Sequence, residues 1–297
     1  MNENTQPLVL VTNDDGIEAP GVRRLIDCLR PMAKVVCVCP SHPRSGMSMA
    51  LTVRDPLRIK RIGDYGDTPM YSVEGGTPAD CVKIARHEIL DRLPDMIVSG
   101  INHGSNAGVN VLYSGTMGAA LEGCALGVPS VGFSLTNHSM DADFSPCYPF
   151  VKPICEAVLR EGLPDGVCLN VNIPDCDPAP VRMRVVRQCH SSWSDEYVKY
   201  TDPWGKPFYI ISGHFVNDEP DNPDTDEWCM SHGITSIVPV SLDRTAPVPG
   251  LVPAPVSTAS GDSDASVTGK ESGRNVAPRP ITWTPGQLRA LAALQDL

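Results

Sequence analysis

The sequence predicts an α/β fold in which a doubly wound, mainly parallel sheet is covered by helices on both faces. Short apolar runs alternate with segments of helical periodicity through the first half of the 297 residues. These runs are continuously apolar, as expected of parallel strands that are buried on both sides. After about residue 180 the pattern changes to strand-like segments separated by turns, which predicts a β-rich C-terminal extension.

The N-terminal half begins the alternation of strand and helix. Leu8–Thr12 is a short apolar run and predicts the first strand. Pro20–Leu29 predicts a helix, because its apolar residues recur at helical spacing and proline suits the first turn. Val35–Cys39 predicts the second strand. Residues 51–62 and 70–73 predict two further strands that form a hairpin.

A helix is predicted over residues 77–90 from the signals at its start. Thr77 is the expected N-cap, Pro78 takes the first position, and Asp80 follows three residues after the cap. Further elements are predicted in this order: a strand at Met96–Ser99, a helix at Thr116–Leu126, a strand at 128–135, a helix at Pro153–Arg160 and a strand at 167–173. Such strand–helix–strand connections build a parallel sheet.

The second half has a different character. Residues 181–188, 195–213 and 234–242 predict antiparallel strands, with Asp202–Gly205 as turn material. We expect them to form the β-rich extension of the domain.

The C-terminal tail is poor in core-forming residues. Residues 246–280 contain six prolines and no aromatic residue, a composition that cannot build a packed core. We therefore divide the chain into one domain at 1–245, a flexible Pro/Ser/Ala-rich linker at 246–281 and an amphipathic helix at 282–297.

The terminal helix is predicted from a capping box and an apolar stripe. Thr284 and Gln287 have the spacing of a capping box. The leucines at helical spacing are Leu288, Leu291, Leu294 and Leu297. A short helix with one such stripe docks either on its own core or on a neighbouring subunit.

The charge balance narrows the class of partner. The chain has 35 acidic and 24 basic residues, a formal net charge of −11. Long nucleic acids need a basic surface, so no nucleic acid polymer is expected as a partner. An acidic protein still binds a small anion where a metal ion supplies the local positive charge.

Cysteine usage and hydropathy indicate the compartment. The 11 cysteines include no C-x-x-C pair, which predicts buried, reduced thiols in a cytoplasmic protein. The opening MNENTQ lacks the basic and apolar regions of a signal peptide. Residues 96–140 carry only one charged side chain, Glu122, but are too rich in Gly, Asn and Ser for a lipid-facing helix. No membrane association is therefore expected.

Two adjacent carboxylates, Asp14 and Asp15, directly follow the first predicted strand. Like charges this close repel each other, so the pair either points apart into water or shares a cation. Gly16 would let the chain turn sharply behind them. An ordinary helix-capping turn with one solvated carboxylate is the alternative interpretation, because Asp and Asn dominate turns.

Four polar loops lie where predicted strands end or a helix begins, the usual place for ligands in open parallel sheets. They are Asn13–Gly16, Arg44–Gly46, Ser99–Asn102 and Tyr113–Thr116. Two carboxylates, a hydroxyl and an amide carbonyl form an all-oxygen site that suits Mg²⁺, Mn²⁺ or Ca²⁺. His42 and His103 lie beside two of these loops as candidates for substrate contact, with solvated loop residues as the alternative.

The stretch "YSGTMGAALEG" has the features of a phosphate-binding helix start. Small residues at a helix start expose backbone N–H groups, and Ser114 and Thr116 add hydroxyl donors, so a phosphate fits there. A plain N-cap is the alternative use of these residues. A phosphate beside a divalent cation is the arrangement of metal-assisted phosphoryl transfer.

Several segments carry a resemblance to a known family. They are "TNDDGIEAPG", "RSGMS", "GGTPADC", "PDMIVSGINHGSNAG" and "YSGTMGAALEG", with "DPWGKPFYIISG" and "TDEWCMSHGITSIVPVSLDRTA" in the second half. In order and spacing they resemble the SurE (survival protein E) family of 5′/3′-nucleotidases, over roughly Leu8 to Ala246. The resemblance implies a Rossmann-like core from which "DPWGKPFYIISG" protrudes as a hairpin.

The resemblance also implies an activity and a set of site residues. Members hydrolyse nucleoside 5′-monophosphates, often 3′-monophosphates and in some cases short polyphosphate, with one divalent cation per subunit, Mg²⁺ or Mn²⁺, or Ca²⁺ in a crystal. By position the metal ligands are Asp14, Asp15, Ser45 and Asn102, of which the two aspartates are also the expected catalytic residues. The phosphate-contacting residues are Asn106, Ser114, Gly115 and Thr116. Members form dimers or tetramers that exchange C-terminal segments, so a homodimer or homotetramer is expected.

The sequence departs from the family pattern near its end, and two rival functions stay open. Asp243–Thr245 reads D-R-T where the family has D-L-T, and Pro247 stands where some members carry a histidine. A haloacid-dehalogenase-type phosphatase would need D-x-D spacing, whereas the two carboxylates here are adjacent. A protein that only binds nucleotide and metal would use the same loops without turnover.

Overall fold

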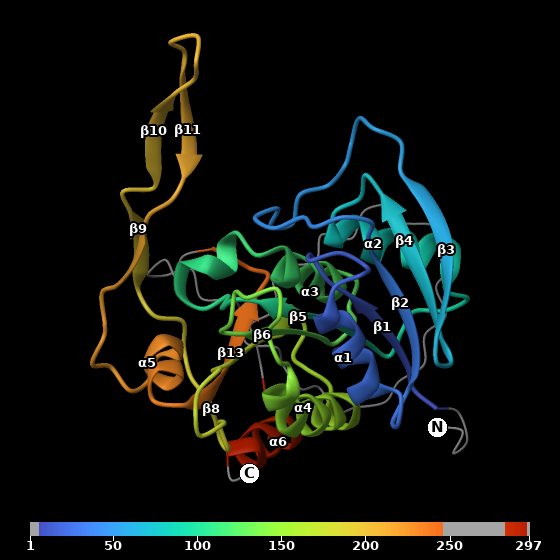
Figure 1. Ribbon diagram of the computed structural model, residues 1–297. Helices are drawn as coiled ribbons and strands as arrows, with labels where there is room; N and C mark the ends of the chain where they lie inside the picture. Colours follow the sequence, from blue (N-terminus) through green and yellow to red (C-terminus); the bar gives the residue numbers. More distant parts are fainter. Residues whose placement is uncertain (1–5, 246–282, 296–297) are drawn as a thin grey trace, which may run out of the picture.

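The computed structural model describes residues 6–245 and 283–295. The strands of its central sheet are β1 (Leu8–Thr12), β2 (Lys34–Pro40), β3 (Arg58–Tyr65), β4 (Thr68–Glu74), β5 (Met96–His103), β6 (Ser130–Leu135), β7 (Val167–Ile173), β8 (Arg182–Val185) and β13 (Ile234–Ser241). Within this part of the chain they form one nine-stranded sheet in the order β3-β4-β2-β1-β5-β6-β7-β13-β8 (Figure 1). Every neighbouring pair from β4 to β7 is parallel, which confirms the predicted α/β fold.

Helices cover both faces of the sheet. They are α1 (Pro20–Leu29), α2 (Pro78–Ile84), α3 (Gly115–Ala125), α4 (Tyr148–Glu161), α5 (Asp226–Ser231) and α6 (Pro285–Gln295), with the shorter turns η1 (Ala85–Ile89), η2 (Gly108–Leu112) and η3 (Ser145–Cys147). Val9 and Val11 of β1 belong to the core that α1 and α4 cover, whereas Leu8 and Leu10 pack with α2 and α3. This two-sided burial explains why the first strand is apolar at every position before Thr12.

Strand β1 lies at the point where the strand order reverses. Its neighbours are β2, which follows it in the chain through α1, and β5, which arrives much later. In doubly wound sheets the ligand crevice opens beyond the carboxyl ends of the strands at this point. The residues after β1 and at the end of β5 therefore meet there.

Three predicted element boundaries are wrong. Strand β5 runs to His103, four residues beyond its predicted end, so the predicted loop Ser99–Asn102 belongs to the strand. Local contacts accompany the other two differences. Residues 51–57 do not belong to a strand, because Thr52 N donates to the Asp80 carboxylate (3.1 Å) and Thr52 Oγ1 donates to Gly75 O (3.1 Å). Helix α4 begins at Tyr148, five residues before the predicted start, with an earlier proline in its first turn. The capping box of Thr77 and Asp80 at the start of α2 is confirmed.

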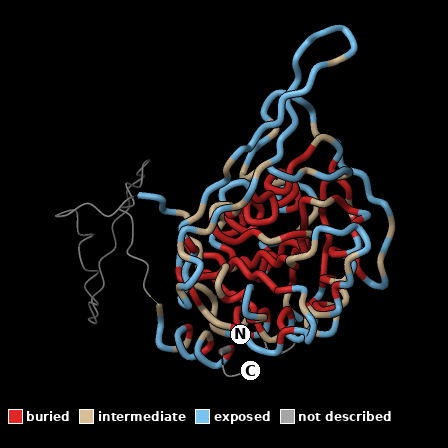
Figure 2. The backbone as a smooth tube through the Cα atoms, turned by 60° about the vertical axis from the view of Figure 1, so that its left-hand side comes forward, coloured by how far each residue is buried: buried red, intermediate tan, exposed pale blue. Residues whose placement is uncertain are grey.

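The predicted β-rich extension divides into two parts. Strands β9 (Ser191–Ser194), β10 (Tyr197–Thr201), β11 (Pro207–Ile211) and β12 (His214–Asn217) form an antiparallel arm that projects from the body and is largely exposed (Figures 1 and 2). The segments predicted at 181–188 and 234–242 instead complete the central sheet. There β13 is antiparallel to β7, but β8 is parallel to β13, contrary to the prediction. The arm and α5 between them make the long crossover that parallel neighbours require.

Helix α6 docks on the chain's own core beside α4 and next to β8 (Figure 1). The Thr284–Gln287 capping box is confirmed, with Gln287 N donating to Thr284 Oγ1 (3.1 Å). The predicted stripe is partly wrong. Leu294 is buried as predicted, but Leu288 is 52 % exposed, and Ala290, which was not part of the stripe, is buried. The linker predicted at 246–281 and Leu297 lie outside the described residues.

Two other observations concern the cysteines and the length of the helices. All 11 cysteines are free thiols, and all but Cys176 are buried, as predicted. Over residues 6–245 and 283–295, no helix combines the length and apolar character needed to cross a lipid bilayer.

Candidate active site

A cleft of about 540 Å³ opens at the carboxyl ends of β1 and β5. Five of the eight predicted metal- and phosphate-binding residues line it, namely Asp14, Ser45, Asn102, Asn106 and Ser114, whereas Asp15, Gly115 and Thr116 are not part of its lining. Its other lining residues are Gly46, His103, Ser105, Asn110, Tyr113, His138, Trp193, Phe215 and Glu227. The fold thus brings together loops that are far apart in the sequence.

A tight turn after β1 presents the two carboxylates. Asn13 Nδ2 donates to Gly16 O (2.9 Å), and Gly16 N donates back to Asn13 Oδ1 (3.2 Å). Gly16 has φ +94°, a conformation that side chains rarely adopt. Asp14 is consequently turned inward, 3 % exposed, while the Asp15 side chain stays partly open at 17 %.

The two carboxylates have different partners. Burial, followed by repulsion from Asp15, raises the pKa of Asp14 from its ordinary 3.8 to about 6. Asp15 Oδ2 accepts a hydrogen bond from His103 N (3.2 Å) and faces His103 Nδ1 at 3.0 Å. Among the described residues, neither carboxylate forms an ion pair with Lys or Arg. The negative charge of Asp14 is therefore poorly compensated, whereas Asp15 has the His103 ring beside it.

Thr116 brings a second loop into contact with this pair. Its Oγ1 donates to Asp14 Oδ1 (2.5 Å) and lies 3.2 Å from Asn102 Oδ1. Asn102 Nδ2 is already used, because it donates to Gly104 O (2.8 Å). The amide oxygen of Asn102 is therefore the atom turned toward Asp14 and Thr116.

The loop after β2 contacts the turn that carries Asp14 and Asp15. Arg44 N donates to Asp14 O (2.6 Å), which ties this loop to the turn after β1. Ser45 is exposed and lines the cleft. The two histidines differ: His103 lines the cleft, whereas His42 is exposed and is not part of its lining.

The N-terminus of α3 faces the same cluster. Ser114 is the N-cap of this helix, and its Oγ accepts a hydrogen bond from Met117 N (3.0 Å). The plain capping use of Ser114 is thus present in the structure. The cap also sets the first turn of α3 against Asp14, where backbone N–H groups favour an anion.

Replacing Gly115 by alanine tests how closely α3 approaches the carboxylates. An added Cβ would lie 2.8 Å from Asp14 Cβ and 2.9 Å from its Oδ2, so the carboxylate must move. Misplacement of a reacting group by about 1 Å costs about a hundredfold in rate, so we expect the kcat of a reaction that uses these carboxylates to fall by that order. Steady-state kinetics measure this, with Gly286→Ala as the control, since its Cβ would meet only the flexible end of Glu161. Unchanged kcat in Gly115→Ala would contradict the close packing.

Asn106 is fixed by a buried network of amides. Asn106 N donates to Asn172 Oδ1 (2.8 Å), Asn106 O accepts from Asn170 Nδ2 (2.9 Å), and Asn106 Nδ2 donates to Ser134 Oγ (2.8 Å). Satisfied networks of this kind hold a side chain in one orientation. Asn106 is therefore a rigid part of the cleft wall.

Several residues of the cleft were missed by the sequence analysis, and three of them, Trp193, Phe215 and Glu227, are placed there by long-range contacts. Trp193 of β9 and Phe215 of β12 form an edge-to-face pair with centroids 5.9 Å apart, and Trp193 Nε1 donates to Asn110 Oδ1 (2.8 Å). Glu227 comes from α5. Two signals in the sequence were available: an aromatic residue inside the polar run "SSWS", and the position of Glu227 within the segment "TDEWCMSHGITSIVPVSLDRTA".

The donor atoms fit a hard divalent cation. Two carboxylates, the Asn102 amide oxygen and the Ser45 hydroxyl are oxygen ligands of the kind that Mg²⁺ and Mn²⁺ prefer. In the part of the chain that the structure describes, no group of three or more His, Cys, Asp or Glu side chains gathers as a metal site. The poorly compensated charge of Asp14 also favours a divalent cation bound through oxygen ligands at this place.

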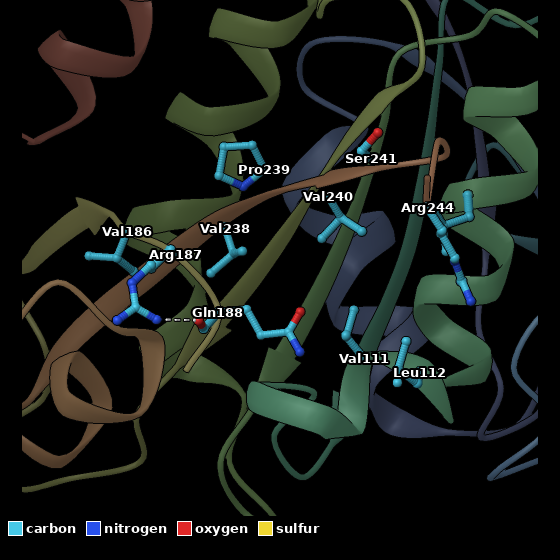
Figure 3. Close-up of a pocket in the computed structure, with 11 residues that line it drawn as sticks. Val111, Leu112, Val186, Arg187, Gln188, Val238, Pro239, Val240, Ser241 and Arg244 are labelled. Atoms are coloured by element: carbon cyan, nitrogen blue, oxygen red, sulfur yellow. Dashed lines mark hydrogen bonds between the residues drawn. The ribbon is translucent and has the colours of Figure 1, made fainter. Parts of the chain in front are cut away.

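A second cleft, of about 460 Å³, has a different chemistry (Figure 3). Most of its lining is apolar and comes from η2, α3 and β13, while Arg187 donates to Gln188 O (3.0 Å) at one side. None of the acid, amide or hydroxyl residues singled out above lines it. The first cleft is therefore the candidate active site.

Comparisons with known proteins identify the family of this chain. A family model described as Survival protein SurE matches residues 9–195. Two similar proteins are both named 5′-nucleotidase SurE: one from Christiangramia forsetii, 48 % identical over 81 % of this chain and 93 % of its own length, and one from Phocaeicola vulgatus, 44 % identical over 81 % and 93 %. The crystal structure of the SurE protein from Aquifex aeolicus is 37 % identical, covers 80 % of this chain and 95 % of its own, and superposes with a TM-score of 0.70. The chain belongs to the SurE family of survival proteins.

Proposed function

We propose that the chain is a 5′-nucleotidase that hydrolyses nucleoside 5′-monophosphates to nucleoside and phosphate with the help of one divalent cation. The observation that carries the proposal is the buried carboxylate of Asp14, which lines the cleft beside the N-terminus of α3 and is followed directly by the second carboxylate, Asp15. The relatives named 5′-nucleotidase support the substrate class. Nucleoside 3′-monophosphates and short polyphosphate are further substrates of the proposal.

The site residues have distinct roles in this proposal. Asp14, Asp15, Ser45 and Asn102 would hold the cation, Mg²⁺ or Mn²⁺. When bound, such a cation supplies Lewis-acid activation of water and neutralises charge on the phosphate. Backbone N–H groups of the first turn of α3, which Ser114, Gly115 and Thr116 open, and the Asn106 amide bind the phosphate oxygens.

Two rival functions make different predictions. A haloacid-dehalogenase-type phosphatase needs a second carboxylate two residues after the first, and that position is Gly16 here. A protein that only binds nucleotide and metal would occupy the same cleft but release no product. Sustained turnover therefore separates the proposal from the binding-only alternative.

Phosphate release by the purified chain tests the proposed function. The substrates are 5′-AMP, 5′-GMP, 3′-AMP and short polyphosphate, each with Mn²⁺, with Mg²⁺ and with EDTA. We expect metal-dependent release from 5′-monophosphates, and the other two substrates define the range. No release from any of them by a folded, metal-loaded sample would favour the binding-only function.

We also propose that a second copy of the chain covers the arm, as in a homodimer or homotetramer that exchanges C-terminal segments. The arm exposes large apolar side chains, among them Trp204 at 81 % and Ile211 at 71 %. Its other exposed large apolar residues are Trp193, Tyr197, Val198, Tyr200, Phe208, Tyr209, Ile210 and Val216. Exposed apolar surface of this extent is typical of protein–protein contacts.

Polar substitutions in the arm test this assembly. Replacing Trp204, Tyr209 and Ile211 together by serine is expected to lower the mass in solution to that of the 31.9 kDa monomer. The cause is the loss of apolar area between copies, and light scattering after size exclusion measures it. Val181→Ser, at another exposed apolar position that lies outside the arm, should leave the mass unchanged. A monomeric unmodified chain would contradict the proposed assembly.

A cytoplasmic location completes the proposal. The many buried thiols support a reducing compartment, because such compartments keep cysteines unpaired.

A further inference from the structure

Glu227 is a half-buried residue that lines the candidate active-site cleft. Its neighbour Asp226 fixes its place: Asp226 Oδ2 accepts a hydrogen bond from Gly108 N (2.9 Å), and Asp226 Oδ1 accepts one from Cys189 N (2.9 Å). These bonds tie the start of α5 both to η2 and to the chain that leads into the arm. Asp226 therefore anchors the start of α5, which carries Glu227, against these two segments.

The carboxylate of Glu227 has no role in holding the fold together. Among the residues that the structure describes, none donates a hydrogen bond to it and none forms an ion pair with it. Burial, and next to it the charge of Asp226, raises the pKa of Glu227 to about 7. A half-buried acceptor without a partner is costly, so its presence in a cleft favours a partner that arrives with the ligand.

The surroundings of Glu227 indicate which part of a nucleotide is its hydrogen-bond partner. The same cleft contains the edge-to-face pair Trp193–Phe215, and Asn110 holds the Trp193 ring in place through its Nε1 hydrogen bond (2.8 Å). Bases stack on aromatic side chains, so the pair offers a surface for the base. The phosphate end of the cleft lies at Asp14 and the start of α3.

A phosphate is the wrong partner for the ionised form of Glu227, because two anions repel each other. Hydroxyl groups are suitable donors, and the nucleoside part of a nucleotide offers two neighbouring ones on its ribose. An acidic residue that accepts hydrogen bonds from ribose hydroxyls is also how dinucleotide-binding folds recognise the sugar.

We propose that Glu227 accepts hydrogen bonds from the ribose 2′- and 3′-hydroxyls and thereby makes the enzyme select ribonucleotides over deoxyribonucleotides. This inference rests on the proposed nucleotidase function. It assigns Glu227 to substrate specificity and leaves the chemical step at the phosphate to the residues around Asp14.

The test compares substrates that differ only in their sugar. The kcat/KM of the unmodified chain, Glu227→Ala and Glu227→Gln is measured with 5′-AMP, 2′-deoxy-5′-AMP, 3′-deoxy-5′-AMP and the sugar-free p-nitrophenyl phosphate. We expect the unmodified chain to prefer 5′-AMP over the deoxy substrates by about tenfold to a hundredfold. Glu227→Ala should lose this preference, mainly through a higher KM for 5′-AMP, and Glu227→Gln should keep part of it. Turnover of p-nitrophenyl phosphate should be unchanged in both variants.

Three outcomes would overturn the inference. One is an unmodified chain that treats the three nucleotides alike, and another is a Glu227→Ala variant that keeps the full preference. The third is an equal loss with p-nitrophenyl phosphate, which would assign Glu227 to the chemistry or the fold instead. Glu156→Gln, an exposed glutamate on α4, is the matched control and should behave as the unmodified chain does.

A binding experiment separates failure of this inference from failure of the proposed function. Calorimetry with adenosine and with 2′,3′-dideoxyadenosine requires no turnover. If the chain releases no phosphate from any nucleotide, the proposed function fails. Equal affinity for the two nucleosides would then also overturn the ribose contact, whereas a preference for adenosine that Glu227→Ala removes would support it.

Discussion

Replacing Asp14 by asparagine is expected to lower turnover of 5′-AMP by about a thousandfold or more, because a cation at the phosphate contributes several kcal/mol. Asparagine keeps an oxygen that accepts the Thr116 hydroxyl, now 2.5 Å from Asp14 Oδ1, but it lacks the charge that holds the cation. Steady-state kinetics with saturating Mn²⁺ measure the loss, and circular dichroism checks the fold. Asp91→Asn, an exposed position outside the cleft, is the matched control. Normal turnover in Asp14→Asn would refute the site.

The same substitution is expected to stabilise the metal-free protein. The pKa of Asp14 is about 6 in the folded chain, above its ordinary 3.8, so the folded state binds this proton more tightly than the unfolded state does. The contribution of this group to stability is therefore full below pH 4, falls between about pH 4 and 6, and is lost above that range. The loss amounts to about 3 kcal/mol at pH 8, and asparagine avoids it.

Denaturant unfolding in EDTA measures this effect. Asp14→Asn should be more stable than the unmodified chain at pH 8 and nearly equal to it at pH 4. Equal stability at both pH values would contradict a buried carboxylate whose charge is poorly compensated. A residue that lowers stability yet is required for activity is typical of functional sites.

Removal of the metal is the second change with a large expected effect. EDTA should abolish phosphate release from 5′-AMP, and Mn²⁺ added in excess should restore it, because the carboxylate pair needs a cation to bind a dianionic phosphate. A cation at about a hundred times its Kd stabilises the folded state by about 2.7 kcal/mol. For a domain of this size, that raises Tm by about 5–10 °C.

The variants Asp91→Asn and Asp14→Asn serve as controls for the predicted effect of the metal. Thermal unfolding with and without Mn²⁺ should show the rise in Tm for the unmodified chain and for Asp91→Asn, but not for Asp14→Asn. Full activity in EDTA, or the same rise in all three proteins, would show that the cation acts elsewhere.

Much of the fold was predictable because local sequence patterns indicate where its strands and helices lie. The continuous apolar run of β1 is explained by burial on both faces, and the capping boxes at Thr77 and Thr284 identified where α2 and α6 begin. Strand partners were less accessible. The parallel pairing of β8 with β13 depends on where the arm and α5 return the chain, which no local pattern records.

The candidate site divides in the same way. Asp14, Asp15 and the start of α3 lie within contiguous motifs, so the sequence alone identified them as candidate site residues. Trp193 and Glu227 enter the cleft only because the arm and α5 fold back toward η2 through hydrogen bonds of Asn110 and Asp226 with residues far along the chain. Helix α6 also shows how spacing misleads, since its leucines follow a regular period but Leu288 faces solvent.

The account depends most on a cation bound between the two aspartates. Anomalous diffraction from crystals grown with Mn²⁺ tests it directly. We expect one strong peak per subunit, about 2.0–2.6 Å from oxygens of Asp14, Asp15, Ser45 and Asn102. A peak at another place, or none in a Mn²⁺-loaded and active protein, would contradict the central claim.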